Sequence, residues 1–205
     1  MASGVSRIAA VILAGGKGER LGGVNKAMLK IGGERLVERA RRAVAGCEPV
    51  LLAVGGNGFA VDGLTAIADL PGDYAGPLAG VAAAVDALAD NDAEWLLSLA
   101  VDTPFFPPDF LDRALSLAPE ANVVLGCFGA QDYPTNALWR LDAIRDLPNA
   151  VRAGTAPHSL KRLVEGLRTI RLDYAGRVAD DPFANVNTPE DFNNLSLLGL
   201  RREPG

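Results

Sequence analysis

Cysteine and histidine are scarce in this chain, which has two cysteines and one histidine among 205 residues. Cys47 and Cys127 lack the spacing of a metal-binding pair, and so few cysteines are usually reduced and often buried. His158 stands near an expected helix start beside Ser159, and the pattern offers it no partners for a nucleophilic triad, so we expect a surface or capping role. These shortages argue against a metal centre built from cysteine and histidine.

The chain also lacks a basic surplus and a long apolar run. Its net charge is −5, from 20 basic and 25 acidic side chains, which argues against general nucleic-acid binding. No apolar stretch reaches the roughly 18 residues that a membrane span needs. Arg7 is followed by only a short apolar segment, which is not the pattern of a signal peptide. We therefore expect a cytoplasmic protein with neither nucleic acid nor a membrane as partner.

The composition, 49% hydrophobic and 22% charged, is typical of a globular protein, and the length predicts a single domain over residues 1–205. Apolar runs alternate with helical patterns, which predicts an α/β fold: a Rossmann-like three-layer sandwich with a mainly parallel sheet and helices on both faces. We expect strands at residues 8–13, 50–54, 64–68, 95–101, 122–128, 135–139 and 167–172, and helices at residues 34–46, 77–89, 108–117, 157–165 and 188–198.

Residues 13–26 form the most informative segment. They follow the first expected strand and include five glycines in nine positions, from Gly15 to Gly23, so the backbone can bend sharply and approach a ligand closely. Four cations stand against one acid between Gly15 and Lys30, a local charge of about +3. A strand that runs into a basic, glycine-rich loop commonly holds a polyphosphate through backbone N–H groups. A flexible basic turn is the alternative.

This loop fits neither of two common phosphate-binding motifs. A Walker A loop requires Ser or Thr after its lysine, and none follows Lys26. The dinucleotide fingerprint requires a third glycine where Leu21 stands, and an acidic strand end about 20 residues later, which is also missing. The segment therefore indicates another class of nucleotide-binding loop.

Two acidic residues are expected at the same edge of the sheet, because ligands of open parallel sheets bind at the carboxyl ends of the strands. Asp102 follows the apolar strand at residues 95–101 and could bind Mg²⁺ opposite a polyphosphate. Capping of the next turn is its alternative role. Asp69 follows the third strand and could accept hydrogen bonds from a guanine edge or a ribose, or be a plain surface acid.

Asparagines add to this group late in the chain. Asn185 and Asn187 flank one residue, so on a strand they would share a face and could bond a phosphate or a metal-bound water. They could equally shape the turn before Pro189.

The string from Leu13 to Lys26 resembles the signature Leu-Ala-Gly-Gly-x-Gly-x-Arg-Met-Gly-Gly-x-Asp-Lys of the molybdenum cofactor guanylyltransferases. Leu21 stands for the Met, and Asn25 stands for the Asp, which removes a carboxylate beside Lys26. The resemblance extends from about residue 8 to residue 192 and is weak between Leu141 and Asp180. Further matching segments are residues 76–80, 102–109, 134–138 and 183–190.

This resemblance implies a nucleotidyltransferase fold and an Mg²⁺-dependent enzyme. Such an enzyme transfers GMP from GTP to the terminal phosphate of molybdenum-molybdopterin and releases pyrophosphate. Molybdoenzyme apoproteins or their chaperones are further candidate partners. The implied catalytic residues are Arg20 and Lys26, which would stabilise the triphosphate, and Asp102, which would hold the metal. The implied nucleotide-binding residues are Leu13, Ala14, Gly15, Gly16, Lys26, Asp69 and Asp102, with Asn57, Asn185 and Asn187 as additional candidates.

Two alternatives stay open. One is a cytidylyltransferase for the same cofactor, or another nucleotidyltransferase of the superfamily. The other is a GTP-binding adaptor that delivers the cofactor to partner enzymes without chemistry. Nucleotide preference separates the first from a guanylyltransferase, and release of pyrophosphate excludes the second.

Overall fold

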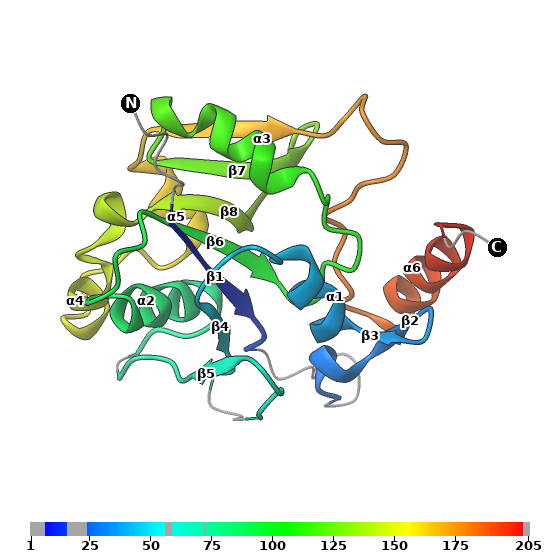
Figure 1. Ribbon diagram of the computed structural model, residues 1–205, viewed down its shortest axis with the longest axis horizontal. Helices are drawn as coiled ribbons and strands as arrows, with labels where there is room; N and C mark the ends of the chain where they lie inside the picture. The colour runs from blue at the N-terminus through cyan, green and yellow to red at the C-terminus, as the bar shows by residue number, and fades with distance from the viewer. Residues whose placement is uncertain (1–6, 16–23, 56–58, 72, 203–205) are drawn as a thin grey trace.

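A central sheet of seven strands organises the chain, in the order β5-β4-β1-β6-β8-β7-β9 (Figure 1). This computed structural model describes residues 7–15, 24–55, 59–71 and 73–202. Every strand of the sheet runs in one direction except β8, which pairs antiparallel with both β6 and β7, so the mainly parallel sheet is confirmed. The strands are β1 (Ile8–Leu13), β4 (Val50–Ala53), β5 (Thr65–Ile67), β6 (Trp95–Ala100), β7 (Val123–Phe128), β8 (Gln131–Arg140) and β9 (Thr169–Asp173).

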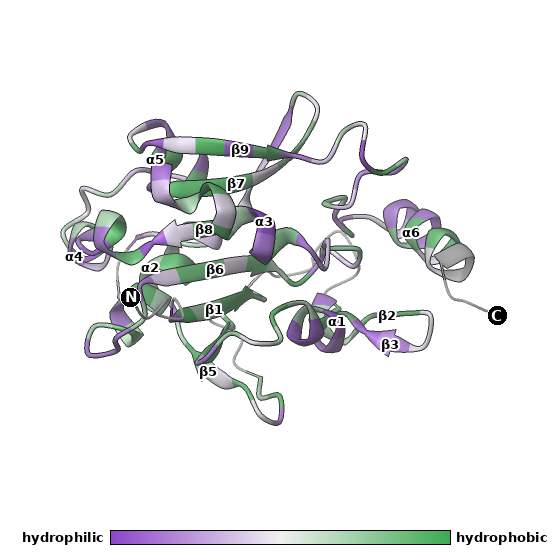
Figure 2. Ribbon diagram, turned by 45° about the horizontal axis from the view of Figure 1, so that its top comes forward, coloured by the Kyte–Doolittle hydropathy of each residue, from purple (hydrophilic) through white to green (hydrophobic). Residues whose placement is uncertain are grey.

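Helices cover both faces of this sheet, because buried apolar side chains alternate along its strands. On β1, Ala10 and Ile12 belong to one core cluster, whereas Ala9 and Val11 belong to the other. Figure 2 shows β1 and β6 as largely hydrophobic ribbons between the two helical layers. The three-layer sandwich is therefore confirmed. The first face is covered by α1 (Leu36–Ala43) and α3 (Phe110–Leu117), and the second by α2 (Pro77–Ala87), α4 (Leu147–Arg152) and α5 (Leu160–Glu165).

The helix expected at residues 34–46 begins later than its pattern indicates. A short antiparallel hairpin precedes it, with β2 (Lys30–Ile31) paired to β3 (Glu34–Arg35). The hairpin turns at Gly32 and Gly33, whose positive φ angles of 58° and 79° favour glycine. The backbone of residues 34 and 35 is therefore committed to strand pairing, and α1 starts only at the next residue.

The last helix, α6 (Pro189–Arg202), packs beside this hairpin, away from the two main layers (Figure 1). Its Gly199 approaches Ile31 so closely that an added Cβ would lie 2.8 Å from the Ile31 side chain. Two other features were not predicted: α4, and the extension of β8 beyond the expected residues 135–139. The remaining expected elements are present, with ends shifted by up to four residues. Within the part of the chain that the structure describes, they are joined by the 3-10 turns η2 (Lys26–Met28), η3 (Ala118–Glu120) and η4 (Leu141–Ile144).

Gly126 packs against an aromatic cluster centred on Phe183. A Cβ built on Gly126 would lie 2.6 Å from the Phe183 ring, which is fully buried and also packs against Tyr133 and Tyr174. We expect Gly126→Ala to lower the free energy of unfolding by about 1–3 kcal/mol through overpacking. The matched control is Gly166→Ala, where the nearest contact of an added Cβ is 3.6 Å. Thermal unfolding checks this prediction, and equal Tm values for the two variants would contradict it.

Candidate active site

The carboxyl ends of β1, β4 and β6 lie side by side. Leu13, the last residue of β1, pairs with Ala53 of β4 on one side and with Ala100 of β6 on the other. The ladder continues one residue further, since Ala14 N–H donates to Ala53 O at 2.8 Å and Val101 N–H donates to Leu13 O at 3.1 Å. The segments that follow these three strands therefore leave the sheet at one edge, as the sequence predicted.

Gly15, Gly55 and Asp69 meet at this edge. A Cβ on Gly15 would lie 3.4 Å from the Gly55 nitrogen, and a Cβ on Gly55 would lie 3.6 Å from the Asp69 Oδ2 atom. Gly55 also has a positive φ of 61°, which favours glycine. Burial raises the pKa of the half-buried Asp69 carboxyl above its ordinary value. The two glycines thus let the backbones that follow β1 and β4 pack closely against each other, with one acidic side chain beside them.

Lys26 joins two other predicted residues at the same edge. Its ammonium donates to Asp102 Oδ2 at 2.7 Å and to Asn187 Oδ1 at 2.7 Å. The side chains of Lys26 and Asp102 are 19% and 16% exposed, so their ion pair is partly shielded from water. Asp102 and Asn187, which follow Lys26 by 76 and 161 positions in the sequence, therefore contact the same ammonium group.

Local capping holds each end of this arrangement. Asn25 begins η2 by accepting a hydrogen bond from Ala27 N–H at 3.0 Å on its side-chain oxygen, so the asparagine that replaces the signature's Asp still caps this turn. At the other end, Asp191 Oδ2 accepts from the N–H groups of Asn187 at 3.0 Å and Thr188 at 2.8 Å. Thr188 caps α6 in return by accepting from Asp191 N–H at 3.1 Å.

Asn185 and Asn187 contact different partners, and of their two alternative roles the one that placed them on one face of a strand is wrong. The segment that carries them is not a strand. Asn185 Oδ1 accepts from the Thr103 hydroxyl at 3.0 Å, whereas Asn187 contacts Lys26. A hydrogen bond of 3.0 Å from Val186 N–H to Asp102 O ties the segment to the loop after β6 instead of to the sheet.

The donor set suits a hard divalent cation. Carboxylate and amide oxygens of Asp102 and Asn187 converge on the single position that the Lys26 ammonium takes. The described residues contain no group of three or more His, Cys, Asp or Glu able to hold a metal ion. Mg²⁺ commonly binds through only one or two carboxylates together with substrate phosphates. The protein part of such a site therefore fits, provided that a phosphorylated ligand completes it.

Three predicted residues, Gly16, Arg20 and Asn57, lie outside the residues that the structure describes. Leu13 and Ala14 are found at the carboxyl end of β1, as expected. His158 is exposed and stacks on Tyr74, with the ring centroids 6.0 Å apart, which agrees with a surface role.

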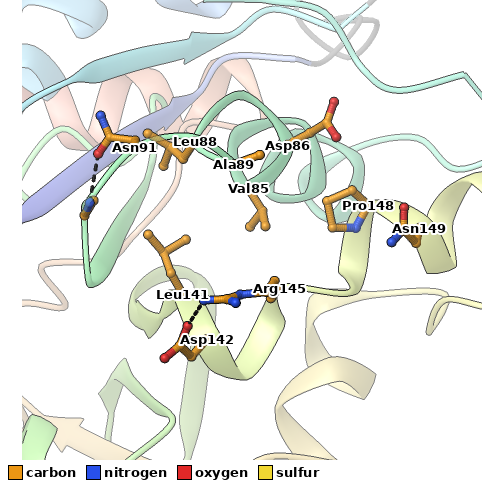
Figure 3. A pocket seen from close by; sticks show the side chains of 11 residues that line it. Val85, Asp86, Leu88, Ala89, Asn91, Leu141, Asp142, Arg145, Pro148 and Asn149 are labelled. Atoms are coloured by element: carbon orange, nitrogen blue, oxygen red, sulfur yellow. Dashed lines mark hydrogen bonds and ion pairs between the residues drawn. The ribbon is translucent and has the colours of Figure 1, made fainter.

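A separate cavity of about 350 Å³ lies at the opposite edge of the sheet (Figure 3). It is lined by the carboxyl half of α2 and by residues around η4 and α4. Its wall includes Ala93, just before β6, and Leu141, just after antiparallel β8, so it is near the amino end of β6. Arg145 pairs there with Asp142, which leaves no comparable set of converging ligands.

None of the helices in the described ranges is long and apolar enough to cross a membrane.

Known proteins share the sequence pattern and the fold of this chain. A family model described as a MobA-like NTP transferase domain matches residues 10–170. The molybdenum cofactor guanylyltransferase of Nitrobacter hamburgensis is 35% identical over 197 residues, which cover 92% of each chain. The protein of the same name from Rhodobacter capsulatus is 36% identical over 188 residues, covering 91% of this chain and 93% of its own.

Solved structures share the fold at lower identity. The molybdopterin-guanine dinucleotide biosynthesis protein A of Archaeoglobus fulgidus superposes with a TM-score of 0.72 at 19% identity, covering 95% of this chain and 99% of its own. A nucleotidyl transferase from a Methanothermobacter species gives a TM-score of 0.74 at 20% identity, covering 96% and 99%. The sandwich with its single antiparallel inner strand is therefore a nucleotidyltransferase fold.

Proposed function

The chain belongs to the molybdenum cofactor guanylyltransferase family and is a nucleotidyltransferase, and from this premise we propose that it transfers GMP from GTP to the terminal phosphate of molybdenum-molybdopterin, releasing pyrophosphate. The observation that carries the proposal is the meeting of Lys26, Asp102 and Asn187 at the carboxyl edge of the sheet, where the strands β1, β4 and β6 end. A cation and hard oxygen ligands held in place are the parts that phosphoryl transfer needs.

Each described residue has one role in this proposal. The nucleotide binds at the carboxyl ends of β1 and β4, where Gly15 and Gly55 pack together, and Asp69 accepts hydrogen bonds from the guanine edge. Lys26 neutralises charge on the triphosphate and on the departing pyrophosphate. The acceptor phosphate attacks the α-phosphorus in line with the leaving group, so the acceleration comes mainly from positioning and from charge neutralisation.

The proposed metal is Mg²⁺, held by Asp102 with Asn187 beside it. When bound, the ion neutralises phosphate charge and orients the triphosphate. Since the Lys26 ammonium occupies the position on which these oxygens converge, it must move away from Asp102 when the ion binds. The same side chain is then available to the triphosphate oxygens.

Thermal unfolding with Mg²⁺ and each of GTP, CTP, ATP and UTP tests the nucleotide. A ligand at about 100 times its Kd stabilises the fold by roughly 2.7 kcal/mol, which corresponds to about 5–11 °C in Tm at this size. We expect this rise for GTP, with a larger rise when Mg²⁺ is present. A rise for CTP alone would contradict guanylyl transfer in favour of cytidylyl transfer. Release of pyrophosphate only when molybdenum-molybdopterin is added then tests the transfer itself, and GTP binding without release would contradict it.

Asp69→Asn should reduce the preference for GTP over ATP by about tenfold to a hundredfold. Guanine presents two adjacent N–H donors, and a carboxylate accepts from both, whereas an amide accepts with one atom only. The ratio of Kd values for the two nucleotides measures the effect. A preference that survives the substitution would contradict a base contact.

The same variant should not lose stability at neutral pH. Burial raises the folded-state pKa of Asp69 above its unfolded value, so the folded protein binds this proton more tightly. The cost of ionising the buried Asp69 carboxyl lowers the free energy of unfolding; this cost is absent below the unfolded-state pKa and fully present above the folded-state pKa. Asparagine cannot ionise, so the variant should become more stable than wild type as pH rises through the folded-state pKa. Urea unfolding across this pH range measures the difference, with wild type as the control.

A further inference from the structure

Three polar side chains in the described ranges are buried: Ser98, Thr103 and Asn136, each no more than 4% exposed. Buried polar groups are costly unless they are hydrogen-bonded. Ser98 is satisfied inside the sheet, where it accepts from Trp139 Nε1 at 2.8 Å. Thr103 and Asn136 instead form a chain of hydrogen bonds that leads out of the core to Asn185. We call this chain the polar relay.

The backbone fixes the direction of every bond in the polar relay. The N–H of Ala100 can only donate, and it donates to Asn136 Oδ1 at 3.0 Å. Asn136 therefore turns its Nδ2 toward Thr103, whose Oγ1 accepts at 3.4 Å. A hydroxyl has one proton, and that of Thr103 is left to donate to Asn185 Oδ1 at 3.0 Å.

Because of this order, the two asparagines offer different groups to a ligand: Asn185 has its N–H groups left over, whereas Asn187 uses its oxygen toward the cation. Asn185 directs its oxygen at Thr103, so both of its amide N–H groups point away from the relay. Asn187 directs its oxygen at the Lys26 ammonium at 2.7 Å. Amide N–H groups suit a phosphate oxygen, whereas an amide oxygen suits a cation.

Resting on the proposed function, we propose that Asn136 and Thr103 are positioning residues, which fix the amide of Asn185 as a hydrogen-bond donor to a phosphate oxygen of a substrate bound at Asp102. The sheet topology explains how Asn136 reaches the site. Asn136 lies on β8, the antiparallel strand beside β6, and so reaches the end of β6 from which Asp102 emerges. The bond from Val186 N–H to Asp102 O, 3.0 Å long, holds the two loops together at this point.

Three variants separate positioning from plain stability. Thr103→Val keeps the shape and removes the hydroxyl, Thr103→Ser keeps the hydroxyl, and Ser98→Ala removes a buried hydrogen bond from the same strand pair without touching the relay. We expect Thr103→Val to lower kcat/KM about tenfold or more, the equivalent of one lost hydrogen bond of this kind. Thr103→Ser and Ser98→Ala should stay within about threefold. An equal loss in Thr103→Val and Ser98→Ala would overturn the proposal.

Separate KM values for GTP and for molybdenum-molybdopterin identify the source of the phosphate oxygen, because only the substrate that bonds Asn185 should show a raised KM in Thr103→Val. A double-mutant cycle adds a stricter criterion. If Thr103 acts through Asn185, adding Thr103→Val to Asn185→Ala should cost almost nothing more. Additive losses would overturn the relay even if the single variant is slow.

One readout needs no substrate and so distinguishes failure of the relay from failure of the proposed function. The side-chain amide protons of Asn185, assigned by their loss in Asn185→Ser, should give a distinct NMR pair in wild type and in Ser98→Ala. In Thr103→Val, or in Thr103→Ala if valine prevents folding, the pair should move toward the values of a free asparagine. An unchanged pair would overturn the relay, whereas wild-type protein that releases no pyrophosphate would contradict only the proposed function.

Discussion

Asp102→Asn is expected to lower the rate of pyrophosphate release by about 10²–10³-fold, the effect typical of removing one preorganised electrostatic group from a site of this kind. The carboxylate is only 16% exposed and lies at the end of a fully buried strand, so its position is fixed before any ligand binds. Asparagine keeps the size of the side chain but removes the charge that a divalent ion requires. The measurement is turnover with GTP, Mg²⁺ and molybdenum-molybdopterin.

The control for this variant is Asp112→Asn, which removes an exposed carboxylate from the first turn of α3. Its rate should equal that of wild type, and both variants should show cooperative unfolding. If Asp102→Asn retains more than a tenth of the wild-type rate, Asp102 does not hold the metal.

Lys26→Met should lower turnover but raise the affinity for a divalent ion. Turnover with Mg²⁺ and GTP should fall by about 10²-fold or more, because charge-assisted bonds to the triphosphate and to the departing pyrophosphate are lost. A divalent ion without nucleotide should bind more tightly, because the ammonium no longer competes for Asp102 and Asn187. Mn²⁺ is the practical probe, since its binding can be followed by electron paramagnetic resonance in the absence of GTP.

Lys30→Met provides the matched control, because Lys30 is an exposed cation on β2 in the same part of the chain. It should leave both turnover and Mn²⁺ affinity unchanged. Unchanged affinity for GTP in Lys26→Met would contradict the assignment of Lys26 to the triphosphate. Weaker binding of Mn²⁺ would contradict competition for the same oxygens.

The core of the fold could be predicted because its signals are local. The strand at Ile8–Leu13 is found as predicted, since six consecutive apolar residues need no distant partner to be recognised. The hairpin before α1 was missed because its two strands are only two residues long, too short for an alternating pattern. The helix α4 was missed because it has only six residues and contains Pro148 in its first turn.

The site could be predicted in part for the same reason. Asp102 and Asp69 are expected at the sheet edge because each follows an apolar run, and the topology of a parallel sheet then places both at the carboxyl ends of its strands. The bond between Lys26 and Asn187 could not be predicted, because 161 residues separate its partners and no periodicity relates them. Asn136 was noticed only within a matching segment, since nothing in a polar residue's sequence context says that its side chain is buried or which way its amide points.

The contact between Lys26 and Asn187 also determines when the site can form during synthesis of the chain. A chain emerges from the ribosome with its N-terminus first, at about 5–20 residues per second, so the 161 positions from Lys26 to Asn187 take on the order of ten to thirty seconds. In the later part of that interval, once Asp102 has been made, Lys26 and Asp102 exist without the segment that completes their cation position. The full arrangement therefore cannot assemble before Asn187 has been synthesised, and the capacity to turn over nucleotide arises only after that point.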